Sequence, residues 1–125
     1  MATRAHKAAT IDGLAISLSG LCLVHCLVLP ILSASLPIVG IWAEAEWLHK
    51  AFVVAAFPLS LLRLSSTAAN TAVTALIVSG LWLLVAGAFV EPMHDFETLL
   101  TVLGGTMLAA GHALGWKRAH TGSQS

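Results

Sequence analysis

Charged residues are scarce in this sequence. Asp, Glu, Lys and Arg make up only 10% of the 125 residues, whereas 58% are hydrophobic, and the mean hydropathy is +0.89. Water-soluble domains carry about 25% charged residues, so this chain has too little polar surface to remain dissolved. Six basic and six acidic residues give a net charge of zero, which excludes the basic surface that nucleic-acid binding requires. The composition therefore predicts a protein of the lipid bilayer without a nucleic-acid partner.

Cysteine is equally rare, and the familiar catalytic motifs are missing. The two cysteines, Cys22 and Cys26, lie within one apolar run, which excludes the disulfide framework of a small secreted domain. The sequence has no glycine-rich phosphate loop, no nucleophile elbow, no Ser/His/Asp arrangement and no paired carboxylates within an apolar run. We expect neither an enzyme nor a tightly bound cofactor.

Four apolar stretches are long enough, or nearly so, to cross a bilayer, which takes about 20 residues of helix. We predict spans at residues 14–36, 49–66, 72–90 and 98–116. The second has only a short apolar run, 51–64, and crosses if His49, Lys50 and Arg63 extend toward the head groups. Short connections force neighbouring helices to run antiparallel. The predicted fold is all-α: one polytopic membrane domain over residues 1–125, an antiparallel four-transmembrane-helix bundle.

The basic residues predict the orientation, since cytoplasmic segments of membrane proteins are rich in Lys and Arg. With a cytoplasmic N-terminus, five of the six basic residues lie inside, together with Asp12, and only Lys50 lies outside. We therefore expect a multi-pass protein of the inner (plasma) membrane with both termini in the cytoplasm. The outer connections then hold the other acids and two histidines: Glu44, Glu46, Glu91, Asp95, Glu97, His49 and His94. We favour the interpretation that acidic residues simply avoid the cytoplasmic loops. The alternative is that this acidic face gathers cations.

Tryptophan and glycine are expected to serve anchoring and packing. Three tryptophans fall at predicted membrane interfaces, whereas Trp82 lies within the third span and is expected to face lipid or to pack. Small residues in the third and fourth spans allow helices to approach closely. These are Gly80, Gly87, Gly104, Gly105 and Gly111.

The first span carries the most informative pattern. At about 100° per residue, Cys22 and Cys26 are neighbours on one helix face, and His25 lies beside them. Small, polar or thiol residues share an arc of about 80° on the same helix. They are Asp12, Ala15, Ser19, Cys22, Cys26, Pro30 and Ser33. Such a stripe faces neighbouring helices rather than lipid, so we expect it inside the bundle.

Two thiols and an imidazole on one helical turn suit a soft metal ion, because thiolates prefer thiophilic cations to Mg²⁺ or Ca²⁺. We expect Pro30 to interrupt the helix and to free backbone carbonyls beside the thiols, as in transporter binding sites. The alternatives are that the cysteines pack as small hydrophobes and that the proline only kinks the helix. A redox role is disfavoured, because the spacing is Cys-x-x-x-Cys rather than Cys-x-x-Cys.

A histidine in the fourth span is a candidate ligand or relay. His112 shares a helix face with Thr101, Gly105 and Leu108, and an ionisable residue at that depth is a functional candidate. Antiparallel packing would bring it level with residues 19–22. The alternative is a hydrogen bond that joins two helices.

Two histidines on the outer side are weaker candidates. His49 lies at the mouth of the second span, on the face of Ser60 and Arg63, and is a possible second ligand or station. His94 lies in a short acidic connection. Neither is assigned a role by spacing alone.

Several segments resemble the MerC family of membrane proteins. The most specific is Leu21-Cys22-Leu23-Val24-His25-Cys26 with Pro30 after it, and further support comes from Glu46-Trp47-Leu48-His49 and Gly111-His112. The likeness extends over residues 12–118. The resemblance implies a four-helix inner-membrane protein associated with mercuric ion uptake, in which Cys22 and Cys26 would handle the ion.

Two features depart from that pattern. Mercury-resistance members carry adjacent cysteines in the first helix and further cysteines near the cytoplasmic side, whereas this chain has Cys22 and Cys26 alone. Hand-off to a second thiol pair within the chain is therefore impossible, and the ion need not be mercury. The Gly-His pair is often followed by Asn three residues later, where this chain has Gly115.

The predicted function is binding and inward transport of a soft metal ion. Hg²⁺ is the first choice, with Zn²⁺ or Cu⁺ as alternatives at the same residues. The candidate ligands are Cys22, Cys26, His25, His112 and His49. The expected partners are periplasmic and cytoplasmic thiol carriers that exchange the ion with the cysteines, and a homo-oligomer is left open. The competing hypothesis is an accessory membrane protein that does not transport and whose cysteines and histidines only pack helices.

Overall fold

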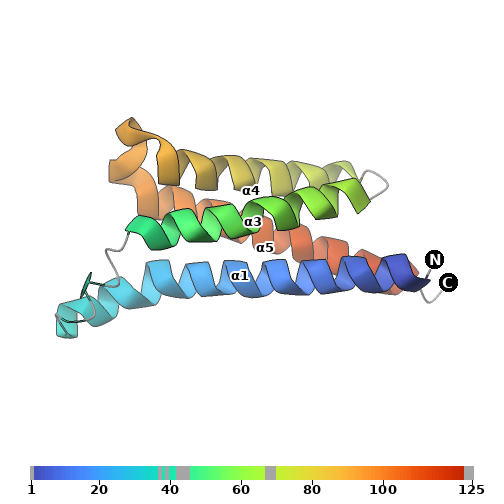
Figure 1. The fold of residues 1–125 in the computed structure, drawn as a ribbon, viewed down its shortest axis with the longest axis horizontal. Helices are drawn as coiled ribbons and strands as arrows, with labels where there is room; N and C mark the ends of the chain where they lie inside the picture. Colours follow the sequence, from blue (N-terminus) through green and yellow to red (C-terminus); the bar gives the residue numbers. More distant parts are fainter. Residues whose placement is uncertain (1, 37, 39, 42–45, 67–69, 123–125) are drawn as a thin grey trace.

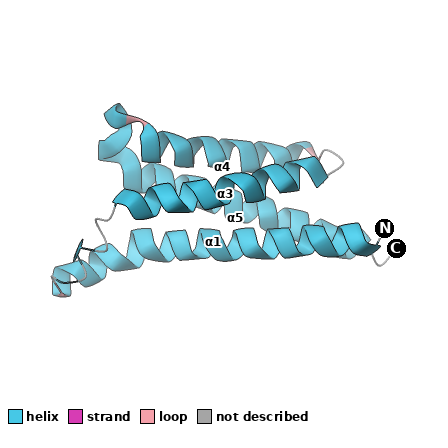
Figure 2. Ribbon diagram, viewed as in Figure 1, coloured by secondary structure: helices cyan, strands magenta, loops and turns pink. Residues whose placement is uncertain are grey.

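The computed structural model describes residues 2–36, 38, 40–41, 46–66 and 70–122. Its long helices are α1 (Ala2–Ser35), α3 (Glu46–Ser66), α4 (Thr71–Phe89) and α5 (Glu97–Gly122). A 3-10 helix, η1 (Glu91–Phe96), joins α4 to α5. Within the described ranges every regular element is helical (Figure 2), which confirms the all-α prediction.

Each long helix contains a segment that is long and apolar enough to cross a membrane. These segments are His6–Leu29, Glu46–Ser65, Thr71–Phe89 and Glu97–Thr121. They overlap the predicted spans, so the prediction of a four-helix membrane bundle is confirmed. The first segment begins earlier than predicted and includes Asp12, which we had expected on the inner side of the membrane.

The helices alternate in direction, and both termini lie at the same end of the bundle (Figure 1). We call this the terminal end, and we call the end that carries η1 and the starts of α3 and α5 the η1 end. α5 packs against both α1 and α4, while α3 contacts α1 and α4 less extensively. Three helices, α1, α3 and α5, therefore enclose the side chains discussed below.

Local signals explain several of the helix ends. Asn70 caps α4, because its side-chain oxygen accepts hydrogen bonds from the backbone N–H groups of Ala72 and Val73. Glu46 and Glu97 lie in the first turns of α3 and α5, where a negative charge is favoured by the helix dipole. The same dipole favours Arg63 in the last turn of α3.

Small residues bring α4 and α5 close together around the apolar core. Ile77 and Leu108 are almost fully buried there. A Cβ atom on Gly104 would lie 2.7 Å from the carbonyl oxygen of Gly80, and one on Gly111 would lie 2.9 Å from Ile77 Cγ1. The predicted packing role of these glycines is confirmed. Trp82, in contrast, is 69% exposed on the outside of the bundle, as a lipid-facing residue would be.

The prediction that Pro30 interrupts the first helix is wrong. α1 continues from Ala2 to Ser35 without a break. Proline lacks an N–H group, so the carbonyl of Cys26, four residues earlier, still loses its usual helical donor. The loss of this one hydrogen bond does not end the helix, although the large side chains next to the proline, Ile31 and Leu32, are exposed.

Candidate metal centre

The small and polar stripe of α1 faces the interior, as predicted. Asp12, Ala15, Ser19, Cys22 and Cys26 are all buried. The side chains of Pro30 and Ser33, the last two members of the stripe, lie outside the described part of the structure. α1 therefore presents its two thiols to α3 and α5 and its large apolar residues to the outside.

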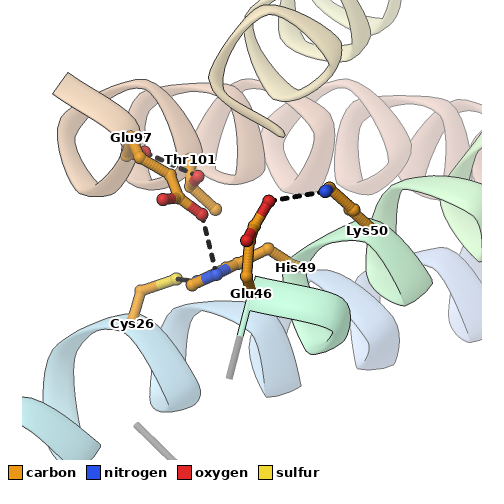
Figure 3. A network of polar contacts seen from close by, with 6 residues as sticks. All are labelled: Cys26, Glu46, His49, Lys50, Glu97 and Thr101. Atoms are coloured by element: carbon orange, nitrogen blue, oxygen red, sulfur yellow. Dashed lines mark hydrogen bonds and ion pairs between the residues drawn. The ribbon is translucent and has the colours of Figure 1, made fainter. Parts of the chain in front are cut away.

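Both cysteines are free thiols, and they are neighbours on α1, one helical turn apart. Cys26 lies near the η1 end of the first span, and Cys22 lies about 6 Å deeper along the helix axis. Cys26 Sγ is 3.3 Å from Nε2 of His49, which α3 supplies from its first turn (Figure 3). The structure thus joins Cys26 to a histidine that is 23 residues away in the chain.

The other ring nitrogen of His49 faces a carboxylate. Nδ1 lies 2.9 Å from Oε1 of Glu97, the first residue of α5, and only 13% of the His49 side chain and 14% of the Glu97 side chain are exposed (Figure 3). Sequence reasoning placed Glu97 among the outer acids and missed this contact. Glu97 and Glu46 each begin an apolar helix, so the sequence does not distinguish them. In the structure Glu46 pairs with Lys50 of its own helix, α3.

His25 adds a second imidazole to this group. It is buried, and its ring packs edge-on against His49 with 5.1 Å between centroids and lies 6.0 Å from the ring of Phe52. Its Nε2 atom is buried and makes no hydrogen bond within the described residues. We call Cys22, Cys26, His25 and His49 the thiol site.

A small cavity adjoins the deeper thiol. Its volume is about 10 Å³, and its walls include Ser19, Cys22, Phe52 and Gly105. That is the space of about one water molecule. The interior beside Cys22 therefore has room for one small occupant between the helices.

The thiol site is not a preformed cage. Across the ranges that the structure describes, no three His, Cys, Asp or Glu side chains are arranged to hold one metal ion. A structural zinc site needs four ligands in tetrahedral geometry. The arrangement instead offers two adjacent thiols with one imidazole beside Cys26, which suits an ion whose strongest bonds are to sulfur.

His112 does not lie beside the cysteines. Its Nδ1 is 2.8 Å from Oδ1 of Asp12, and the same oxygen is 2.9 Å from Nε of Arg63. We call these three residues the Asp12 cluster. Asp12 precedes Cys22 by ten residues of helix, so the cluster lies about 15 Å closer to the terminal end than Cys22 does. The expectation that His112 lies level with residues 19–22 is therefore wrong.

Arg63 also corrects an expectation. We expected it to extend toward the head groups, but it is only 5% exposed and lies inside the bundle with Asp12. A Cβ atom on Gly115 would lie 2.5 Å from Nη2 of Arg63, so glycine at this position leaves space for the guanidinium. A buried charge is retained only when it is paired, and Asp12 supplies the partner.

Three expectations concern residues or side chains that the structure does not describe. Trp42 and Glu44 lie outside the described residues, and so does the side chain of His94. Trp47 is 63% exposed and Trp116 is 44% exposed, in keeping with their predicted place at membrane interfaces.

Comparison with known protein families matches residues 12–117 to the family described as MerC mercury resistance protein. The match covers nearly the whole chain and includes the thiol site and the Asp12 cluster. The chain is therefore a multi-pass membrane protein of a metal-resistance class. It belongs to the MerC family of mercury resistance proteins. No match was found among the curated proteins or the solved structures compared.

Proposed function

We propose that this protein binds mercuric ion at Cys22 and Cys26 and moves it inward across the membrane. The observation that carries the proposal is the contact of 3.3 Å between Cys26 Sγ and His49 Nε2 at a buried turn that also holds Cys22. Membership of a mercury resistance family supports the choice of ion. The buried ring of His25, 5.1 Å from that of His49 between centroids, places a second imidazole at the same turn.

Thiol exchange is the chemistry that fits two thiols. An ion arriving as a complex with two carrier ligands forms a bond to Cys26 sulfur while one carrier ligand leaves. It then forms a bond to Cys22 sulfur while the second ligand leaves. Each cysteine gives up one proton, which the departing ligand or a nearby base accepts, and the oxidation state of the metal does not change. Two further exchanges with a cytoplasmic thiol reverse these steps and release the ion inside.

The order of the two thiols follows from their depth. Cys26 lies closer to the η1 end, and Cys22 lies about one turn deeper. The terminal end carries most of the basic residues, including Lys7, Lys117 and Arg118, so we place it in the cytoplasm and the η1 end outside. Under this orientation, in the inner membrane, the ion reaches Cys26 first and Cys22 second.

Zinc fits the described geometry less well. Zn²⁺ favours four tetrahedral ligands, and no three potential ligands are gathered for one ion within the described ranges. A thiophilic ion needs only the two adjacent thiols. His112 is left out of the proposed ligand set, because its Nδ1 faces Asp12 and its helix turn lies away from the cysteines.

The test is a titration of the detergent-purified protein with Hg²⁺ in competition with a small thiol. We expect one ion per chain in the wild type, much weaker retention in Cys22→Ser and Cys26→Ser, and no binding above background in the double variant. Ser17→Ala, an exposed position on the same helix, is the matched control and should bind like the wild type. Uptake into proteoliposomes loaded with thiol then tests transport. Equal weak binding by wild type and double variant would refute the thiol site.

A further inference from the structure

The contact between His49 and Glu97 determines which nitrogen of the imidazole faces the thiol. Nδ1 of His49 lies 2.9 Å from Oε1 of Glu97, and two lone pairs at that distance would repel each other, so Nδ1 is the nitrogen that carries hydrogen in the neutral ring. Nε2 then presents its lone pair to Cys26 Sγ at 3.3 Å. The three groups come from α5, α3 and α1, and the His49 ring lies between the thiol and the carboxylate (Figure 3).

This arrangement has the form of an activated nucleophile. Thiols react as nucleophiles when a base within hydrogen-bonding reach is itself held by a third group. Carboxylates that orient a metal-binding histidine through its other nitrogen act in the same way. We propose that Glu97 is the positioning residue of the thiol site: by fixing the tautomer of His49, it makes Cys26 the thiol that bonds the incoming ion first.

The proposal rests on the proposed function, since it concerns the order in which the same thiols react. The step it assigns is balanced. The Cys26 S–H proton moves to His49 Nε2, a bond forms between sulfur and mercury, and the bond between mercury and its departing ligand breaks. Cys22 is the internal comparison, because the contacts of His49 and Glu97 place the imidazole beside Cys26.

The experiment uses a mercurial that bonds a single thiol, so that each cysteine is measured separately. The purified full-length Cys22→Ser protein reports Cys26, and the Cys26→Ser protein reports Cys22. In the first background we expect Glu97→Leu to slow the reaction by about tenfold or more, as for other residues that orient a reactive histidine. In the second background the same change should leave the rate within about twofold.

Three further variants separate positioning from a structural role. Glu97→Gln keeps a carbonyl oxygen that can accept from Nδ1, so it should restore much of the rate lost in Glu97→Leu. Adding Glu97→Leu to His49→Ala should cause no further slowing, because Glu97 acts through His49. Glu91→Gln removes one charge from the exposed η1 helix and should change nothing. Nitrogen NMR of His49 should show hydrogen on Nδ1 in the wild type and a mixture of tautomers in Glu97→Leu.

Equal slowing of Cys22 and Cys26, or an unchanged tautomer in Glu97→Leu, would overturn the inference. If Glu97→Leu does not fold, the nitrogen NMR spectrum of wild-type His49 still decides the inference, because hydrogen on Nε2 instead of Nδ1 would overturn it. The proposed function fails separately, when the wild type does not retain Hg²⁺ against a competing thiol. If the wild type retains Hg²⁺ but Cys22 and Cys26 react equally fast, the proposed function stands and the proposed role of Glu97 is wrong.

Discussion

His112 and Asp12 are 100 residues apart in the chain, yet Nδ1 of one lies 2.8 Å from Oδ1 of the other in the interior of the bundle. Arg63 approaches the same carboxylate oxygen, so one atom of Asp12 joins α1, α3 and α5. All three side chains are at least nine-tenths buried. The cluster fixes the relative position of the helices that carry the thiol site at one end and the termini at the other.

Removal of Arg63 should destabilise the bundle. Arg63→Met leaves the carboxylate of Asp12 buried without its cationic partner, and we expect a loss of about 3 kcal/mol in the free energy of unfolding. Arg63→Met combined with Asp12→Asn should lose less, because no unpaired charge remains. The measurement is reversible unfolding in mixed detergent micelles, with exposed Arg118→Met as control. Equal losses for Arg63→Met and Arg118→Met would contradict the buried pair.

Gly115 should be coupled to Arg63. A Cβ atom at position 115 would lie 2.5 Å from Nη2 and 3.0 Å from Nε of Arg63, which Asp12 holds in place. We expect Gly115→Ala to cost about 1–3 kcal/mol of stability. The cost should vanish in Arg63→Met, since the obstacle is then gone. Gly20→Ala is the control, because a Cβ atom there meets nothing within 4 Å. Additive losses in the double variant would show that the two residues do not contact.

Close packing of α4 on α5 gives a third prediction. A Cβ atom on Gly104 would lie 2.7 Å from the backbone oxygen of Gly80, and backbone cannot move aside as a side chain can. Gly104→Ala should therefore lower the melting temperature, with a cost of about 1–3 kcal/mol. Gly13→Ala, which has nothing within 4 Å of the new atom, should be neutral or slightly stabilising. A neutral Gly104→Ala would mean that α4 and α5 are farther apart than described.

Sequence reasoning predicted the parts of this protein that depend on helix periodicity. Hydropathy predicted four membrane-spanning helices and 100° per residue predicted the buried stripe from Asp12 to Cys26, and both are confirmed, although the first apolar segment, His6–Leu29, lies earlier than the predicted 14–36. Contacts between helices do not follow from periodicity. Glu97 and Arg63 resembled ordinary residues at the ends of short connections, because their partners, His49 and Asp12, lie on other helices.

Two expectations were wrong for residues that disfavour a membrane helix. Pro30 was expected to break α1 and Arg63 to reach the head groups, since each is costly inside an isolated membrane helix. In the structure α1 stays helical through the proline, and Asp12 pairs with the arginine inside the bundle. A partner on another helix therefore outweighed the local preference of Arg63, whereas the proline costs α1 one hydrogen bond without ending it.

The identity of the ion can be tested through His25. If two thiolates hold Hg²⁺, removing an imidazole changes the equilibrium little, and His25→Ala should retain Hg²⁺ within a few-fold of the wild type. A zinc ion would need His25 and His49 together with both thiols to reach four ligands. Its affinity should then fall by about 100-fold or more in His25→Ala, given that each lost ligand is worth several kcal/mol. Competition titrations measure the affinities for Hg²⁺ and for Zn²⁺ in the wild type and in His25→Ala. His120→Ala is the control, because His120 is exposed near the C-terminus. Tight Zn²⁺ binding that depends on His25 would indicate a four-ligand zinc site, and loss of Hg²⁺ retention in His25→Ala would refute a mercury site made of two thiolates alone.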